Sequence, residues 1–372
     1  MTTHPHSQPC FVYTGCYTEQ LSFVDGRGQG ITILTFDPAS GALTPVGEVT
    51  GLTNPSYLTL DPQQRFLYAV RETDGRRRDK PAVHAFAVDP ATGGLRYLNH
   101  QPAGGTSPCH VTTDLSGRWV LVANYGTGTV TVYPIHKNGR LGRPANTVRH
   151  QGASVNLERQ TGPHAHQIAL DPTNRFVFVA DLGLDKIMIY RLDPDRGRLV
   201  PHEPRFAPLH PGAGPRHLDF HPTGRYVYVL NELDATLVAF VHSDGRLIPI
   251  QVVSTLPPGA DARPSCAAIR VAPSGRFVYT SNRGHDSIAL FAVDDATGRL
   301  TPLGHQPAGG QTPREIAIDP SGAFLLAANQ DSHTIVTFHI DPDTGQLHPA
   351  GPVLQLPSPV CLAFGGPATA RG

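Results

Sequence analysis

Two charged side chains that could act on one substrate stand at the two ends of a single short segment, residues 214–233. Arg216 and His217 come near its start and Glu232 near its end, and two apolar runs joined by a Pro-Thr-Gly turn lie between them. Apolar residues alternate along both runs, which is typical of a β-hairpin. A hairpin returns the chain to its starting edge, so we expect Arg216 and Glu232 to meet there. An arginine can stabilise a developing negative charge and a carboxylate can take a proton from water, although a purely structural ion pair is the alternative.

A second group of candidates is formed by histidines and arginines elsewhere in the chain. His164 and His166 have a period-two spacing that would point both rings to the same side of a strand. Zinc would need a third protein ligand, and no Cys, Asp or Glu of regular spacing supplies one, so we expect no metal. Substrate contact or proton transfer by His166 is the preferred hypothesis, with structural hydrogen bonding as the alternative. Arg283 and Arg314 could grip a carboxylate or a phosphate, or could merely bridge neighbouring repeats.

The elements that must position these residues belong to a unit that is repeated seven times. Its most regular part is a turn of the form Asp-Pro-x-Thr-Gly-x-Leu, seen as DPASGAL, DPATGGL and DPDTGQL, with looser copies between them. The copies recur about every fifty residues, a period typical of propellers and solenoids. A pair of β-rich runs and a short opening strand accompany each turn, which gives four strands per repeat.

Seven such units predict an all-β protein, a seven-bladed β-propeller with four-stranded blades, in which residues 1–372 form a single domain. The last opening strand, residues 358–364, has no hairpin after it, and the first hairpin, which begins at Phe11, has no opening strand before it. The N- and C-terminal strands should therefore pair in one blade and close the ring. A solenoid, the alternative, should have capped ends that lie far apart.

Polar residues crowd the expected mouth of the central channel, where the opening strands begin and the second strands end. The residues that we assign to substrate binding at this mouth are His164, His217, Arg283, Arg314 and Gln330. Four asparagines occupy one equivalent position in four blades, and such repetition favours a structural role in capping the following loop. These asparagines are Asn124, Asn231, Asn282 and Asn329. The long connection of residues 142–162 is expected to lie over one face.

Composition excludes several classes of partner. The chain has 30 basic and 30 acidic residues, so its net charge gives no reason to expect nucleic acid or an anionic membrane as partner. No apolar run is long enough to span a bilayer and no secretory leader is evident, so a cytoplasmic protein is expected. The five cysteines lack any C-x-x-C spacing, which favours buried free thiols. The sequence leaves the oligomeric state open.

Four segments carry a resemblance to a known family. They are TGPHAHQIALDP, GPRHLDFHPTGRYVYVLNEL, SNRGHDSIALF and PREIAIDPSG. Together they resemble the seven-bladed lactonase family, which includes propeller-type 6-phosphogluconolactonase and the fungal carboxy-muconate cyclase, and the resemblance covers nearly the whole chain. It implies hydrolysis of a small anionic sugar lactone, with 6-phosphogluconolactone as the expected substrate and no cofactor. It also places His166, Arg216, Glu232 and Arg283 where the family's proposed active-site residues lie.

The reaction that the resemblance implies assigns a role to each of these residues. Arg216 and His166 would polarise the carbonyl, and Glu232 would act as general base toward water if its pKa suits. Arg283, with Arg314 or His164, would hold the anionic end of the substrate. A cycloisomerase acting on a muconate would use the same arginines for carboxylates and a proton donor at His166 or Glu232. A non-catalytic propeller would instead show exposed apolar residues at its mouth.

Overall fold

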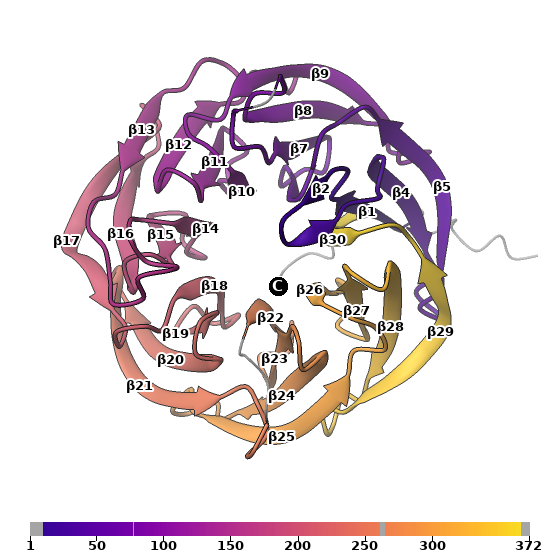
Figure 1. Cartoon of the computed structure of the whole chain (residues 1–372), viewed down its shortest axis with the longest axis vertical. Helices are drawn as coiled ribbons and strands as arrows, with labels where there is room; N and C mark the ends of the chain where they lie inside the picture. Colours follow the sequence, from indigo (N-terminus) through magenta and orange to yellow (C-terminus); the bar gives the residue numbers. More distant parts are fainter. Residues whose placement is uncertain (1–9, 77, 261–264, 366–372) are drawn as a thin grey trace, which may run out of the picture.

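The computed structural model describes residues 10–76, 78–260 and 265–365. These residues form seven antiparallel sheets of four strands and one two-stranded hairpin, and no helix occurs among them. The seven sheets are arranged in a ring as the blades of a propeller (Figure 1). The predicted all-β, seven-bladed architecture is therefore confirmed. Among these residues there is no helix that could cross a membrane.

Each blade runs from an innermost strand at the channel to an outermost strand at the rim. The innermost strands are β30 (Pro359–Gly365), β6 (Leu58–Leu60), β10 (Pro108–Thr113), β14 (Ala165–Leu170), β18 (Pro215–Phe220), β22 (Cys266–Val271) and β26 (Pro313–Ile318). The second strands are β1 (Cys10–Cys16), β7 (Phe66–Arg71), β11 (Trp119–Asn124), β15 (Phe176–Asp181), β19 (Tyr226–Asn231), β23 (Phe277–Asn282) and β27 (Phe324–Asn329). The third strands are β4 (Gly30–Phe36), β8 (Ala82–Val88), β12 (Thr129–Pro134), β16 (Lys186–Asp193), β20 (Thr236–Ser243), β24 (Ser287–Val293) and β28 (Thr334–Ile340). The outermost strands are β5 (Leu43–Thr50), β9 (Leu95–Pro102), β13 (Asn146–Arg149), β17 (Arg198–Pro208), β21 (Arg246–Ser254), β25 (Leu300–Pro307) and β29 (Leu347–Gln355).

The hydrophobic core lies between the blades. Every residue of β15 and of β19 is buried, because the neighbouring blades cover both faces of these strands. That is why their sequences, FVFVAD and YVYVLN, are almost continuously apolar. Phe178 of one blade packs with Leu218 and Val229 of the next. Such shared clusters make each blade a structural support for its neighbour.

The two ends of the described chain close the ring. Strand β1 pairs with β30 in antiparallel register from Phe11 opposite Gly365 to Cys16 opposite Pro359. Figure 1 shows this join as an indigo strand beside a yellow one. The closure expected from the complementary half-units is therefore confirmed. The described chain does not have the separated, capped ends of a solenoid. The five cysteines are all free, and all but Cys10 are buried.

A glycine in each of the seven repeated turns rests on an aromatic ring of the preceding blade. All seven glycines have positive φ, between 62° and 82°, and a Cβ added to any of them would lie 2.1 to 2.8 Å from the ring. The pairs are Gly41 with Phe324, Gly93 with Phe11, Gly139 with Phe66, Gly197 with Trp119, Gly245 with Phe176, Gly298 with Tyr226 and Gly345 with Phe277. The contacts therefore run around the whole ring in one direction and close on themselves.

Replacing Gly197 by alanine should test this contact. Its φ of 62° disfavours any other residue, and the new Cβ would lie 2.2 Å from the Trp119 ring, which donates its indole N–H to the Pro194 carbonyl at 3.0 Å. We expect a loss of about 3 kcal/mol in the free energy of unfolding, from backbone strain and overpacking together. Trp119 is the single tryptophan of the chain, so its fluorescence reports the transition.

The matched control is Gly51→Ala. Gly51 has a φ of 78° but nothing within 4 Å of a built Cβ, so this variant carries the backbone strain alone. It should lose only about 1 kcal/mol. Equal losses in the two variants would show that the aromatic contact contributes nothing.

Two regions depart from the regular repeat. The connection of residues 142–162 contains the short outermost strand β13, so only its second part is an insertion. That part does reach the mouth face, as expected, through the contacts of Arg159 described below. A small hairpin of β2 (Gln20–Leu21) and β3 (Val24–Asp25) was not expected from the sequence, and Figure 1 shows β2 near the inner end of its blade.

Candidate active site

The innermost strands enter the channel through a β-bulge that recurs from blade to blade. In β18 the register shifts between Pro215 and His217, which leaves Arg216 as the extra residue. The extra residues at the same place in β10, β14 and β26 are Cys109, His166 and Arg314. A bulge interrupts the alternation of a strand and re-aims a side chain. Neighbours such as Arg216 and His217 can therefore both face the channel.

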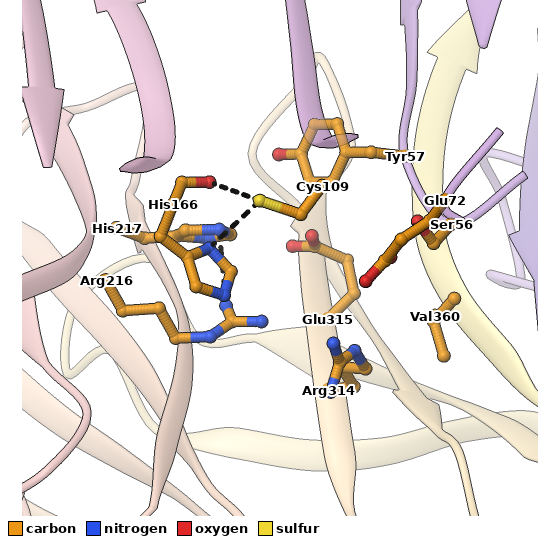
Figure 2. Close-up of a pocket in the computed structure, with 10 residues that line it drawn as sticks. All are labelled: Ser56, Tyr57, Glu72, Cys109, His166, Arg216, His217, Arg314, Glu315 and Val360. Atoms are coloured by element: carbon orange, nitrogen blue, oxygen red, sulfur yellow. Dashed lines mark hydrogen bonds between the residues drawn. The ribbon is translucent and has the colours of Figure 1, made fainter. Parts of the chain in front are cut away.

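The bulge residues line a pocket in the channel (Figure 2). Its complete lining is Ser56, Tyr57, Glu72, Cys109, His166, Arg216, His217, Arg314, Glu315 and Val360. In the view of Figure 2, His166, His217 and Arg216 lie on one side, and Glu72 and Arg314 lie on the other. The lining comes from six of the seven blades, so the chemistry of the site exists only in the closed ring.

Glu232 follows β19 and lies among three arginines. Its Oε2 is 3.1 Å from Nε of Arg216 and 3.0 Å from Nη2 of Arg283. Its Oε1 is 2.7 Å from Nη2 of Arg159, a residue of the inserted connection. The hairpin β18–β19 thus brings Arg216 and Glu232 together as expected. Their catalytic roles stay predictions.

The charged side chains of this cluster shift one another's pKa values. Burial by itself would raise the pKa of the Glu232 carboxyl, but the charges of Arg283, Arg216 and Arg159 outweigh it and hold that pKa well below its usual range. Burial, with the charges of Arg283 and Arg314, lowers the pKa of Arg216 to about 10. Both side chains are therefore charged at neutral pH. Because a carboxylate with so low a pKa is a weak base, its arginine partners limit how readily Glu232 takes a proton.

Three neutral imidazoles adjoin this ion pair. The ring centroids of His166 and His217 are 5.3 Å apart, and those of His110 and His217 are 5.8 Å apart. Burial lowers the pKa of His110 to about 3. Burial and the charge of Arg216 hold the pKa values of His166 and His217 well below the usual range. At neutral pH these rings are therefore uncharged, and each can accept a hydrogen bond at one ring nitrogen and donate one at the other.

Arg314 and Glu72 form the opposite wall through Tyr17. Nη2 of Arg314 donates to the Tyr17 hydroxyl at 2.9 Å, and its guanidinium lies 5.2 Å above the Tyr17 ring. The same hydroxyl donates to Oε2 of Glu72 at 3.0 Å, and the Ser56 hydroxyl donates to that oxygen as well. These bonds hold the Arg314 and Glu72 side chains in place.

The structure does not bring every expected residue to the pocket. His166, Arg216, His217 and Arg314 line it. Glu232 is not in the lining but contacts Arg216, and Arg283 adjoins the pocket through Glu232. His164 does not line it, because its ring stacks on Tyr125 at 4.4 Å and its Nδ1 lies 2.9 Å from the Tyr125 carbonyl oxygen. Gln330 is fully buried outside the lining and donates to Asp331 at 2.8 Å. Substrate binding by His164 and Gln330 stays a prediction that this geometry does not support.

The repeated asparagines have the structural role that their repetition indicated. The side-chain amides of Asn124 and Asn329 each donate to a backbone carbonyl at 3.1 Å, and that of Asn282 does so at 2.8 Å. Asp181 takes the equivalent place in another blade and accepts the backbone N–H of His164 at 2.7 Å. The amide of Asn231 instead donates to the Thr236 hydroxyl at 2.8 Å. In these five blades the contacts tie the end of the second strand to the loops around it.

No residue set in the described ranges has the make-up of a metal centre. Across residues 10–76, 78–260 and 265–365, no group of three or more His, Cys, Asp or Glu side chains could hold an ion. His164 and His166 both contact the Tyr125 ring. Because His166 is the extra residue of a β-bulge, the two side chains do not share the same surroundings.

Comparison with known proteins places the chain in a family. Residues 11–364 match the family model for the seven-bladed β-propeller lactonases. The chain is 36% identical to a 6-phosphogluconolactonase of Bacillus subtilis over 82% of this chain and 83% of that protein. A solved structure of a putative 6-phosphogluconolactonase from Bacteroides fragilis is 33% identical, with a TM-score of 0.90 over 98% of this chain and 100% of the other. A periplasmic gluconolactonase from Pseudomonas aeruginosa is also 33% identical, with a TM-score of 0.89 over 96% of this chain and 99% of the other. The chain therefore belongs to the seven-bladed β-propeller lactonase family.

Proposed function

We propose that the protein hydrolyses sugar lactones and that 6-phosphogluconolactone is its substrate. The observation that carries this proposal is the buried Arg216, held against Glu232 and beside the neutral His166 in a pocket of the channel. The relatives named 6-phosphogluconolactonase support the choice of reaction and of substrate. A non-catalytic propeller would not need a charged cluster buried at this position.

The reaction needs three tasks from these side chains. Water attacks the lactone carbonyl carbon, and the carbonyl oxygen becomes an oxyanion that Arg216 stabilises, an interaction worth about 3 to 4 kcal/mol. The attacking water gives up a proton to Glu232, and neutral His166 is placed to hydrogen-bond the oxyanion or the water. The ring C–O bond then breaks, and the ring oxygen takes the proton that Glu232 received and becomes a hydroxyl, which restores the Glu232 carboxylate. The products are a carboxylate and a sugar-chain alcohol, with no oxidant or reductant consumed.

The charge around the site suits an anionic substrate. Arginines at or beside the pocket outnumber glutamates, with Arg159, Arg216, Arg270, Arg283 and Arg314 against Glu72, Glu232 and Glu315. Arg270 is 2.7 Å from Glu315, so the surplus lies mainly with the arginines around Glu232 and with Arg314. Buried arginines with bidentate donors favour phosphate and carboxylate groups.

A lactone panel with purified protein tests the proposal. Hydrolysis releases a proton, so a pH indicator follows 6-phosphogluconolactone, gluconolactone and an unrelated lactone once the uncatalysed rate is subtracted. We expect the highest kcat/KM on the phosphorylated sugar lactone. Turnover of a carboxy-muconate with no lactone hydrolysis would assign the protein to the cycloisomerase branch instead.

Exhaustive chelation should leave the turnover of the preferred lactone unchanged. The reason is that the described residues offer no His, Cys, Asp or Glu cluster for an ion, while Arg216 can stabilise the oxyanion. The measurement compares the initial rates of dialysed enzyme with and without chelator. A loss of rate that one divalent ion restores would contradict the metal-free mechanism.

The cellular location of the protein also belongs to the proposal. The cytoplasmic location expected from the sequence is kept as a prediction, although a similar solved protein is named periplasmic. The oligomeric state is left open.

A further inference from the structure

Arg159 is the one arginine of the Glu232 cluster that no blade supplies. It lies in the inserted connection, in a turn that is closed by the Gln160 backbone N–H donating to the Asn156 carbonyl at 2.7 Å. The side chain of Gln160 is completely buried and donates to the Leu182 carbonyl at 2.8 Å and to Asp185 at 2.7 Å. The backbone next to Arg159 is therefore anchored to a blade, so its side chain starts from a fixed point near Glu232.

The side chain of Arg159 is held less firmly than those of its two companions. Nη1 of Arg216 donates to the Ala267 carbonyl, and Arg283 donates to the carbonyls of Ser265 and Cys266 at 3.1 and 3.0 Å. Among the described residues, the Arg159 guanidinium has only side-chain partners, Glu232 at 2.7 Å and the Tyr125 hydroxyl at 3.3 Å. Its side chain is 40% exposed, against 4% for Arg216 and 15% for Arg283. It can leave Glu232 without breaking a bond to the backbone.

The cluster also has more positive charge than Glu232 alone can balance. Three arginines share one carboxylate, and each contributes to holding the pKa of Glu232 low. An incoming anion can therefore take one arginine while two remain on the carboxylate. The solvent-facing partner is the one that such an anion meets first.

We propose that Arg159 exchanges Glu232 for the phosphate group of the substrate and so selects phosphorylated lactones, an inference that rests on the proposed lactonase function. The exchange places a charge-assisted hydrogen bond on the phosphate, which the unphosphorylated sugar cannot make. It also removes one positive charge from Glu232, which becomes a better proton acceptor at the moment when the substrate is bound. Phosphate recognition and proton transfer are thereby coupled through one side chain.

The test compares wild-type protein with Arg159→Gln and with Arg143→Gln. Arg143 lies in the same connection but is exposed, so its loss should leave all rates unchanged. For Arg159→Gln we expect the ratio of kcat/KM on 6-phosphogluconolactone to that on gluconolactone to fall by about tenfold or more, the scale of one lost bond to a charged group. An equal loss on both lactones would overturn the inference, because Arg159 would then only position Glu232.

A binding measurement separates this inference from the proposed function. Calorimetric titration with 6-phosphogluconate and with gluconate needs no turnover, so it decides the role of Arg159 even if no lactone is hydrolysed. A tenfold loss of affinity for 6-phosphogluconate alone in Arg159→Gln supports the inference. Unchanged affinity for 6-phosphogluconate overturns it, whatever the lactone assay shows.

Discussion

Replacing Arg216 by lysine is expected to lower kcat/KM for the preferred lactone by about a hundredfold or more while the protein remains folded. Lysine keeps the positive charge beside Glu232 but loses the planar fork that can hold the oxyanion and the carboxylate together. Loss of one preorganised donor of this kind costs about 3 to 4 kcal/mol in the transition state. The companion variant Glu232→Gln should lose as much, because an amide cannot take the proton of the attacking water.

A matched control tests whether any arginine-to-lysine substitution in this protein would lower the activity. Arg175 forms an exposed pair with Asp244 at 2.9 Å, and Arg175→Lys should leave kcat/KM unchanged because exposed pairs are worth about 0 to 1 kcal/mol. Circular dichroism and thermal unfolding of all variants separate catalysis from stability. Wild-type kcat and KM in both Arg216→Lys and Glu232→Gln would reduce the buried pair to a structural contact and remove it from the mechanism.

Ending the chain at Pro357 is expected to abolish cooperative folding. This truncation removes β30, and β1 would become an open strand edge in the first blade. It also removes Val360, Cys361 and Leu362, which are at most 5% exposed. Burial of each such side chain stabilises the protein by about 1.5 to 3 kcal/mol, so their joint loss approaches the whole stability of a typical domain. Thermal unfolding and size-exclusion chromatography would show the change.

Complementation with a peptide provides the control for this truncation. A peptide of residues 358–365 added to the truncated protein should restore the unfolding transition, whereas the same peptide with Leu362→Asp should not, because Leu362 packs in a buried apolar cluster with Val12 and Leu34 and a carboxylate there would have no partner. Leu362 lies opposite Thr14 in the register of β1 and β30. An unfolding midpoint that the truncation leaves unchanged would mean that the ring does not depend on this strand.

The sequence predicts the ring well, because the same pattern of turn and strands recurs seven times. One turn such as DPATGGL is weak evidence for a hairpin, but seven copies with matching strands leave little choice of architecture. The complementary half-units at Phe11 and Ser358 even specify how the ring closes. Aligning the repeats also predicts which residues lie at the mouth, because the first positions of the opening strands all lie at the same end of the channel.

The details of the site are harder to predict because they depend on departures from regularity. Strict alternation would send Arg216 and His217 to opposite faces, and only the bulge brings both to the pocket. Nothing in the sequence of the connection marks Arg159 as a partner of Glu232, since the contact depends on where Gln160 is buried. Tyr17 was missed because its contacts with Glu72 and Arg314 join parts of the chain far apart in sequence.

The glycine and aromatic contacts lie at the end of each blade opposite the bulges, because the third strand runs away from the mouth before it reaches the turn. One face of the protein thus carries the contacts that lock the ring, and the other carries its chemistry. Substitutions of the bulge side chains on the second face leave the glycine and aromatic contacts of the first face unchanged. A lineage can in this way inherit the ring unchanged while its insertions and bulge residues diverge toward new substrates.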